Sequence, residues 1–209
     1  MLSRIDEIIY PNRCEVIEFI DLQRFVYPIF KNGSTSLIYA PKYKFKILIN
    51  DQIKRASVID IILRDPTDRF ISGVNTFVYN TKQENPLLDL NTIIYFAENY
   101  LFLNRHYSPQ FSWLLNLNKY LNKNTQLRLH DMKTLSEFTL DHLSPLEDKV
   151  LTDEQIKKLT ENIHNEMYIR LDSLLLQLVG KEMTLIDIMA YLHEQDPIAY
   201  LKIKCTAPD

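Results

Sequence analysis

The amino-acid sequence predicts an α/β fold in which a central parallel sheet is flanked by helices and the C-terminal third is helical. The clearest signal is the apolar, β-branched run VIDIIL at residues 58–63, which stops at Arg64-Asp65-Pro66. Such a run is typical of a parallel strand that is buried on both faces. Strand-like and helix-like segments alternate through the first two-thirds of the chain, whereas only helical patterns follow Thr152. This alternation favours a sheet wrapped by helices.

Strand-like composition marks further segments. RFVYPIF at 24–30 is rich in β-branched and aromatic residues, and we assign a strand to it. Residues 15–20 have a similar composition but receive no assignment, and residues 44–49 fit either a strand or a short helix. Residues 125–132 alternate between apolar and polar side chains, which predicts another strand.

Helical patterns occupy much of the remaining chain. STSLIYA can open a helix with Ser34 or Thr35 near its N-cap, and Pro41 closes it. Longer helices are expected at 68–80 and 90–105, and a short helix or an irregular segment is expected at 111–121.

The C-terminal part carries helix boundary signals. Thr152 and Gln155 have the spacing of a capping box, and Gly180 suits the residue that follows a helix end. We expect a single domain over the 209 residues, with an α/β core at 1–140 and a helical part at 141–209.

Composition and charge exclude several classes of protein. The net charge of -3 gives no general attraction to nucleic acid or anionic membranes. Two cysteines, Cys14 and Cys205, do not make a disulfide framework or a zinc site. We expect neither a signal peptide nor a membrane span, because no apolar run approaches ~20 residues. A cytoplasmic location is therefore predicted.

The stretch KNGSTS at 31–36 follows the strand predicted at 24–30. Gly33, one of three glycines, would let the backbone approach a ligand closely, while Lys31 adds a positive charge. Amides and hydroxyls at the start of the following helix could bind an anion. The spacing differs from the G-x-x-x-x-G-K-[ST] loop of nucleotide triphosphatases. An ordinary turn with a helix cap remains the alternative.

A second polar motif, RDPTDRFISG at 64–73, follows the predicted buried strand. Arg64 stands at the carboxyl end of that strand, where ligands bind in open α/β sheets. A guanidinium and the hydroxyl of Ser72, eight residues further on, can together bind a phosphate. The alternative is a surface pair of Arg64 with Asp65 and a helix capped by Asp68.

Together, these motifs resemble those of the sulfotransferases that use 3′-phosphoadenosine 5′-phosphosulfate (PAPS). That family has P-K-x-G-x-T-[ST] followed by R-[DN]-P-x-x-R-x-x-S, and this chain has IFKNGSTS and RDPTDRFIS. RHYSPQF at 105–111 resembles the H-[WF]-x-P-Q segment of the carbohydrate sulfotransferases. Phe30 replaces the proline that usually precedes the lysine. The resemblance covers roughly residues 22–140 and implies a P-loop-like three-layer fold in a compact bacterial or viral relative.

The resemblance also implies roles for individual residues. Lys31 would stabilise the leaving oxygen while the sulfuryl group passes in line from PAPS to a hydroxyl or amine, with a carbohydrate as the expected acceptor. Arg64 and Ser72 would bind the 3′-phosphate, and no metal is needed. A histidine suits the general base, with His106 as first candidate and His130 as second. The 5′-phosphate would be held by Lys31, Asn32, Gly33, Ser34, Thr35 and Ser36.

Other residues receive secondary interpretations. Asp60, in the buried strand, could be a base or a partner for Arg64. Arg69 is a weaker candidate for the 3′-phosphate, because its equivalent in the family could be a helix-surface residue, and Gln110 could orient a substrate or the loop. Trp113 could line an acceptor groove, although core packing is the preferred interpretation.

Two other classes of function stay open. A P-loop-type kinase or nucleotide triphosphatase would bind ATP with Mg²⁺, although its loop pattern is missing. A non-catalytic protein could retain the fold, although the intact Lys31, Arg64 and Ser72 speak against lost function. Nucleic-acid binding is disfavoured by the slightly acidic charge.

Overall fold

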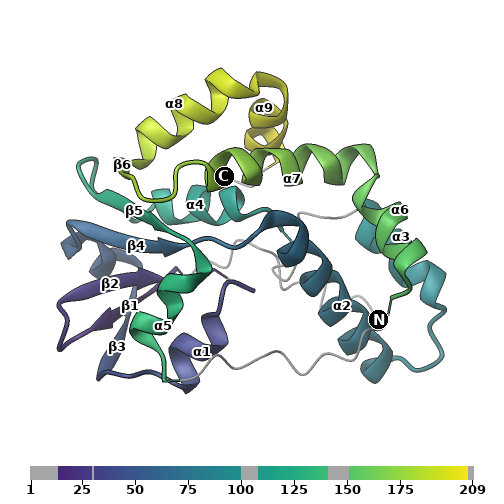
Figure 1. The fold of residues 1–209 in the computed structure, drawn as a ribbon, viewed down its shortest axis with the longest axis horizontal. Helices are drawn as coiled ribbons and strands as arrows, with labels where there is room; N and C mark the ends of the chain where they lie inside the picture. Colours follow the sequence, from purple (N-terminus) through teal and green to yellow (C-terminus); the bar gives the residue numbers. More distant parts are fainter. Residues whose placement is uncertain (1–13, 30, 100–107, 141–150, 207–209) are drawn as a thin grey trace.

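Figure 1 shows a computed structural model of the chain, which describes residues 14–29, 31–99, 108–140 and 151–206. A six-stranded sheet runs through it in the order β3-β1-β2-β4-β5-β6. The strands are β1 (Glu15–Phe19), β2 (Arg24–Tyr27), β3 (Phe45–Ile49), β4 (Val58–Ile62), β5 (Gln126–His130) and β6 (Glu182–Thr184). The α/β class predicted from the sequence is confirmed.

The sheet is mixed, so the prediction of a parallel sheet holds only for its centre. β4 lies between β2 and β5 and is parallel to both, which confirms the interpretation of the VIDIIL run. β1, β3 and β6 are antiparallel to their neighbours. The turn from Ile20 to Gln23 is too short for the crossover that a parallel pair needs, so β1 and β2 form a hairpin.

Helices are present where the sequence predicts them at 34–40, 68–80, 90–105 and 111–121, and residues 100–105 of the third lie outside the described residues. The helices are α1 (Ser34–Tyr39), α2 (Pro66–Glu84), α3 (Leu90–Asn99), α4 (Gln110–Asn118), α5 (Leu135–Phe138), α6 (Asp153–Thr160), α7 (Ile163–Leu176), α8 (Leu185–Gln195) and α9 (Pro197–Thr206), with 3-10 helices η1 (Asn50–Arg55) and η3 (Met132–Thr134). In the part of the chain that the structure describes, none of these helices has the length and apolar character that crossing a bilayer requires.

α2 begins earlier than predicted because its first turn is well capped. The side chain of Asp65 accepts a hydrogen bond from the amide of Asp68 at 2.9 Å, and Pro66 occupies the first turn. Proline suits that position because it has no amide to leave unpaired. Asp65, not Asp68, is therefore the cap of this helix.

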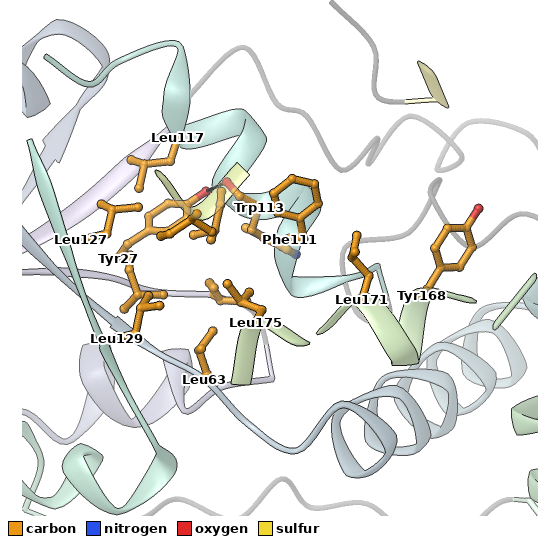
Figure 2. Packing of buried hydrophobic residues seen from close by; sticks show 14 of the residues in the cluster. Tyr27, Leu63, Phe111, Trp113, Leu117, Leu127, Leu129, Tyr168, Leu171 and Leu175 are labelled. Atoms are coloured by element: carbon orange, nitrogen blue, oxygen red, sulfur yellow. Dashed lines mark hydrogen bonds between the residues drawn. The ribbon is translucent and has the colours of Figure 1, made fainter. Parts of the chain in front are cut away.

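The larger apolar cluster covers one face of the sheet, beneath α2, α4, α7 and α8 (Figures 1 and 2). Tyr27 from β2 and Trp113 from α4 meet there, and the Tyr27 hydroxyl donates to the Trp113 carbonyl at 3.1 Å. Trp113 is buried and its indole nitrogen donates to Ser108 Oγ at 2.9 Å. Trp113 is therefore a core residue, which confirms the interpretation preferred from the sequence, core packing.

A smaller apolar cluster lies on the opposite face, against α1 and α5. Phe19 and Phe138 stack there with ring centroids 5.2 Å apart. The buried members of this cluster are Ile17, Phe19, Val26, Leu37, Ile62, Leu135 and Phe138. Helices therefore cover both faces of the sheet, although the cover on this side is small (Figure 1).

Next to this smaller cluster, Asp60 of β4 is paired with groups from both neighbouring strands. Arg24 of β2 donates from Nε to Asp60 at 2.8 Å, and His130 Nε2 lies 2.7 Å from the other carboxylate oxygen. Burial of the carboxyl favours its neutral form, but the hydrogen bonds from His130 and Arg24 outweigh burial and lower the pKa of Asp60. Asp60 is thus ionised and joins three strands, and among the described residues it forms no hydrogen bond or ion pair with Arg64.

The C-terminal part is helical except for β6. The capping box of Thr152 and Gln155 is present at the start of α6. Gly180 has a φ of 84°, and its amide donates to the Leu129 carbonyl at 2.8 Å. This glycine turns the chain from α7 back to the sheet, where β6 pairs with β5. Three residues carry too little pattern to predict such a strand from sequence.

We predict that Asp60→Asn lowers the free energy of unfolding by about 3 kcal/mol, because Arg24 and His130 lose their buried anionic partner. Urea unfolding at neutral pH measures the change. Asp51→Asn, which removes an exposed partner of Lys54, is the control and should cost less than about 0.5 kcal/mol.

The same variant tests the charge of Asp60. Since the pKa is lowered from the ordinary 3.8, the stabilisation is complete above that pH and is lost as the pH falls through the folded-state pKa. The difference between wild type and Asp60→Asn should therefore shrink below pH 3.8. A difference that stays constant on acidification would contradict the assignment.

Candidate functional site

The two polar motifs meet at one edge of the sheet. β2 and β4 are parallel neighbours, so the loops that follow them leave the sheet at the same end. Arg64 Nη1 donates to the carbonyl oxygen of Lys31 at 3.1 Å, which joins the two loops directly. The loop that carries Lys31 and the loop that leads from Arg64 into α2 therefore lie together.

Lys31 occupies an unusual backbone conformation and reaches toward α2. Its φ of 66° lies in the left-handed region, which costs a non-glycine residue roughly 1–2 kcal/mol. The ammonium group donates to Thr76 Oγ1, and that hydroxyl in turn donates to the Ser72 carbonyl at 3.0 Å. The positive charge thus lies beside the turn of α2 that carries Ser72.

The buried hydroxyl of Ser72 has no hydrogen-bond partner among the described residues. Its Oγ is shielded from solvent, and among the described residues no hydrogen-bond partner lies within reach. Buried hydroxyls in proteins are nearly always hydrogen-bonded, so an unpaired one calls for an explanation. A ligand oxygen held beside Lys31 and Arg64 would provide that partner.

Asn32 supports the loop rather than facing a ligand. Its side chain is buried and donates from Nδ2 to the Ile62 carbonyl at 2.8 Å and to Gln110 Oε1 at 2.5 Å. Its amide donates to the Ile29 carbonyl at 3.1 Å. All its donors are therefore engaged inside the protein, and only the acceptor Oδ1 is left without a hydrogen bond among the described residues.

Gly33 is required by both conformation and space. Its φ is 80°, and a Cβ placed there would lie 2.4 Å from Leu135 Cδ2. Gly33 is also the N-cap of α1, whereas the sequence predicts the cap near Ser34 or Thr35, one or two residues later. The glycine thus allows the loop to pack against the segment that follows β5.

The three hydroxyls after Gly33 lie in different environments. Thr35 is exposed, whereas Ser34 and Ser36 are buried. The ladder of helical hydrogen bonds begins with the Leu37 amide, which donates to the Gly33 carbonyl at 3.0 Å. Thr35 is therefore the hydroxyl of this run that is best placed to meet an anion.

Two buried charged residues that the sequence did not reveal, Arg69 and Asp172, contact the segment that begins α4. Arg69, a weaker candidate for the 3′-phosphate in the sequence, is buried rather than exposed on the helix surface, and it donates to the Ser108 carbonyl. Burial lowers its pKa to about 10, with the Asp172 charge opposing that shift and Arg64 adding to it. Burial raises the pKa of Asp172 to about 6, against the opposing effects of Arg69 and of the Gln110 and Phe111 amides.

Of the two histidines predicted as candidate bases, the structure describes only His130. His106 lies outside the described residues. His130 ends β5, opposite Ile62 in the sheet register, and its carbonyl accepts a hydrogen bond from the Leu63 amide at 2.8 Å. Its ring is paired with Asp60 and is partly exposed. His130 therefore lies one strand away from the loop that carries Arg64.

We predict that Gly33→Ala destabilises the protein by about 2–3 kcal/mol, because the methyl group meets Leu135 at a positive φ. In a Leu135→Ala background the same substitution should cost only about 1 kcal/mol, the part due to conformation. Chemical unfolding of the four proteins in this double-mutant cycle measures the coupling. Strict additivity would contradict the packing explanation.

The raised pKa of Asp172 predicts a pH dependence of stability. Between pH 3.8 and about 6 the native carboxyl holds a proton that the unfolded chain has lost, so the stabilisation is complete below 3.8 and lost as the pH rises through about 6. The stability of wild type relative to Asp172→Asn should fall between pH 4 and pH 7, as measured by urea unfolding. Parallel pH profiles would show that Asp172 titrates normally.

Comparison with known proteins does not assign a family. No protein-family model, curated protein or solved structure matched this chain. The likeness to PAPS-dependent sulfotransferases therefore rests on the sequence motifs. Its functional meaning depends on the contacts between Lys31, Arg64 and α2 at the carboxyl edge of the sheet.

Proposed function

We propose that the protein is a PAPS-dependent sulfotransferase that transfers a sulfuryl group to a hydroxyl or amine, with a carbohydrate as the favoured acceptor class. One observation carries this proposal: the Arg64 guanidinium donates to the Lys31 carbonyl at 3.1 Å. This contact unites two motifs that the resemblance assigns to the two ends of one nucleotide. The P-loop-like three-layer architecture belongs to the same proposal.

The charges of the site suit a ligand with two anionic groups. Lys31 and Arg64 carry full positive charges on adjacent loops, and Arg69 is buried behind them. α1 has only six residues, so its dipole adds little and the side chains must supply most of the attraction. A guanidinium also binds a phosphate in a directed, two-pronged manner.

Ser72 supports the choice of a nucleotide with a 3′-phosphate. Its buried hydroxyl lacks a hydrogen bond among the described residues and lies on the helix that Lys31 contacts through Thr76. We assign Arg64 and Ser72 to the 3′-phosphate and the loop from Lys31 to Ser36 to the 5′-phosphosulfate. Asn32 contributes by holding this loop, since its donors are already engaged.

PAPS supplies the transferable sulfuryl group in this scheme, and the residues of this chain bind it and balance its charge. Lys31 is the only cation of the first loop, so we assign it to the oxygen that becomes negatively charged. Its ammonium group donates to Thr76 Oγ1, which keeps it beside α2. A short rotation of a flexible lysine side chain would exchange that partner for the ligand.

Two histidines are candidates for the base that removes the proton of the acceptor. His106 remains the first candidate because of its motif. His130 is the second, and its hydrogen bond with Asp60 at 2.7 Å orients the ring as carboxylates do for catalytic histidines. His106→Ala and His130→Ala, compared in the same transfer assay, distinguish the two.

We predict that the protein binds adenosine 3′,5′-bisphosphate (PAP), the product of transfer, with micromolar or tighter affinity. Arg64→Ala should weaken PAP binding by about ten- to a hundred-fold, because a charge-assisted contact is lost. Isothermal titration calorimetry measures the affinities. Arg170→Ala, which removes an exposed arginine paired with Asp196, is the matched control and should bind PAP normally.

Substitution of Lys31 should separate turnover from binding. Lys31→Gly is preferable to Lys31→Ala because glycine accepts the φ of 66° without strain. We expect Lys31→Gly to be about 1 kcal/mol more stable than Lys31→Ala. Both variants should lower kcat by about a hundred-fold or more while weakening PAP binding less.

A few measurements would overturn the proposal. No calorimetric signal or thermal shift with saturating PAP excludes the nucleotide. Tighter binding of ATP than of PAP, dependent on Mg²⁺, would favour a kinase or nucleotide triphosphatase instead. PAP binding without transfer of radiolabelled sulfate to any glycan, lipid or small alcohol would favour a non-catalytic protein that retains the fold.

A further inference from the structure

We infer that Gln110 is a positioning residue that sets the separation between the two anion-binding loops, so that one bisphosphate can engage both. The inference rests on the proposed function for the identity of the ligand. Gln110 lies at the first position of α4, distant in sequence from both loops, and is completely buried. The sequence suggested only that it orients a substrate or the loop.

A single side-chain amide connects both loops. Gln110 Oε1 accepts from Asn32 Nδ2 at 2.5 Å and from the Arg64 amide at 3.0 Å. Gln110 Nε2 donates to the Arg64 carbonyl at 2.9 Å. The backbone of Arg64 is therefore held at both its donor and its acceptor, while the first loop is held through Asn32.

Gln110 is itself fixed by the C-terminal helices. Asp172 of α7 accepts hydrogen bonds from the backbone N–H of Gln110 at 2.6 Å and from the backbone N–H of Phe111 at 3.0 Å. Phe111 of α4 and Leu171, the neighbour of Asp172 on α7, belong to the same buried apolar cluster (Figure 2). The position of both loops thus depends on α7 through Asp172 and Gln110.

The chemistry of these contacts requires an amide. Glutamate at this position would keep the acceptors for Asn32 and Arg64 but would set a carboxylate oxygen against the Arg64 carbonyl. Leucine would keep much of the volume and remove every hydrogen bond. Leaving buried donors and acceptors without partners favours local movement of the loops.

Fixed separation matters because a bisphosphate binds two subsites at once. Binding of the first phosphate raises the affinity of the second subsite for the other phosphate only when the two subsites lie at the spacing that the ligand spans. A site whose loops move independently retains each phosphate contact but loses this gain. Gln110 should therefore affect a ligand with two phosphates more than a ligand with one.

The test compares Gln110→Leu and Gln110→Glu with wild type, using PAP, adenosine 5′-phosphate and adenosine 3′-phosphate as probes. We expect Kd for PAP to rise by about ten-fold or more in both variants. Kd for each monophosphate should change by less than about two-fold. Ser112→Ala, a buried substitution on the same helix, is the control and should leave all three affinities unchanged.

Equal weakening of PAP and both monophosphates would overturn the inference, because it indicates general damage to the site. Unchanged PAP affinity would overturn it as well. Unfolding curves establish that each variant is folded, and Gln110→Glu serves if Gln110→Leu is not.

A ligand-free measurement separates this inference from the proposed function. If wild type does not bind PAP, the proposed function fails, whereas the bridge itself remains testable by hydrogen exchange. Amides of residues 31–36 and 63–65 should exchange faster together in Gln110→Leu than in wild type. Unchanged exchange in either loop would contradict the bridging role.

Discussion

The parallel pairing of β2 with β4 is the constraint on which the candidate site depends. Parallel neighbours end at the same edge of a sheet, so the loops after them must emerge side by side. An antiparallel pair would have placed Lys31 and Arg64 at opposite edges. The hydrogen bond from Arg64 to the Lys31 carbonyl is a consequence of this arrangement, and so is the reach of Lys31 to α2.

Buried polar groups then fix the relative position of the two loops that the pairing of β2 with β4 places side by side. Gln110 is completely buried and joins both loops, while Asp172 holds the start of α4. Such groups are stable only when their hydrogen bonds are made, which gives them directional control that an apolar contact lacks. The C-terminal helices thereby contribute to the site although their sequence carries no recognisable motif.

The two faces of the sheet serve different purposes. One face carries the large apolar core under α2, α4, α7 and α8. The other combines a small apolar cluster with the ion pairs of Asp60, which use Arg24 and His130 from the flanking strands. This explains why an acid occurs within an otherwise apolar strand: it faces the side of the sheet that has the smaller helical cover.

The α/β class, the central parallel strand, most helices and the two motifs could be predicted from sequence, because these depend on local periodicity and short-range spacing. The mixed character of the sheet could not, since strand direction depends on pairing between distant segments, and it became apparent from the three-dimensional fold. Likewise, the three-dimensional fold shows that Arg69 is buried, that Asn32 supports its loop and that Gln110 connects both motifs. These roles arise from contacts between residues far apart in the chain, which local pattern does not encode.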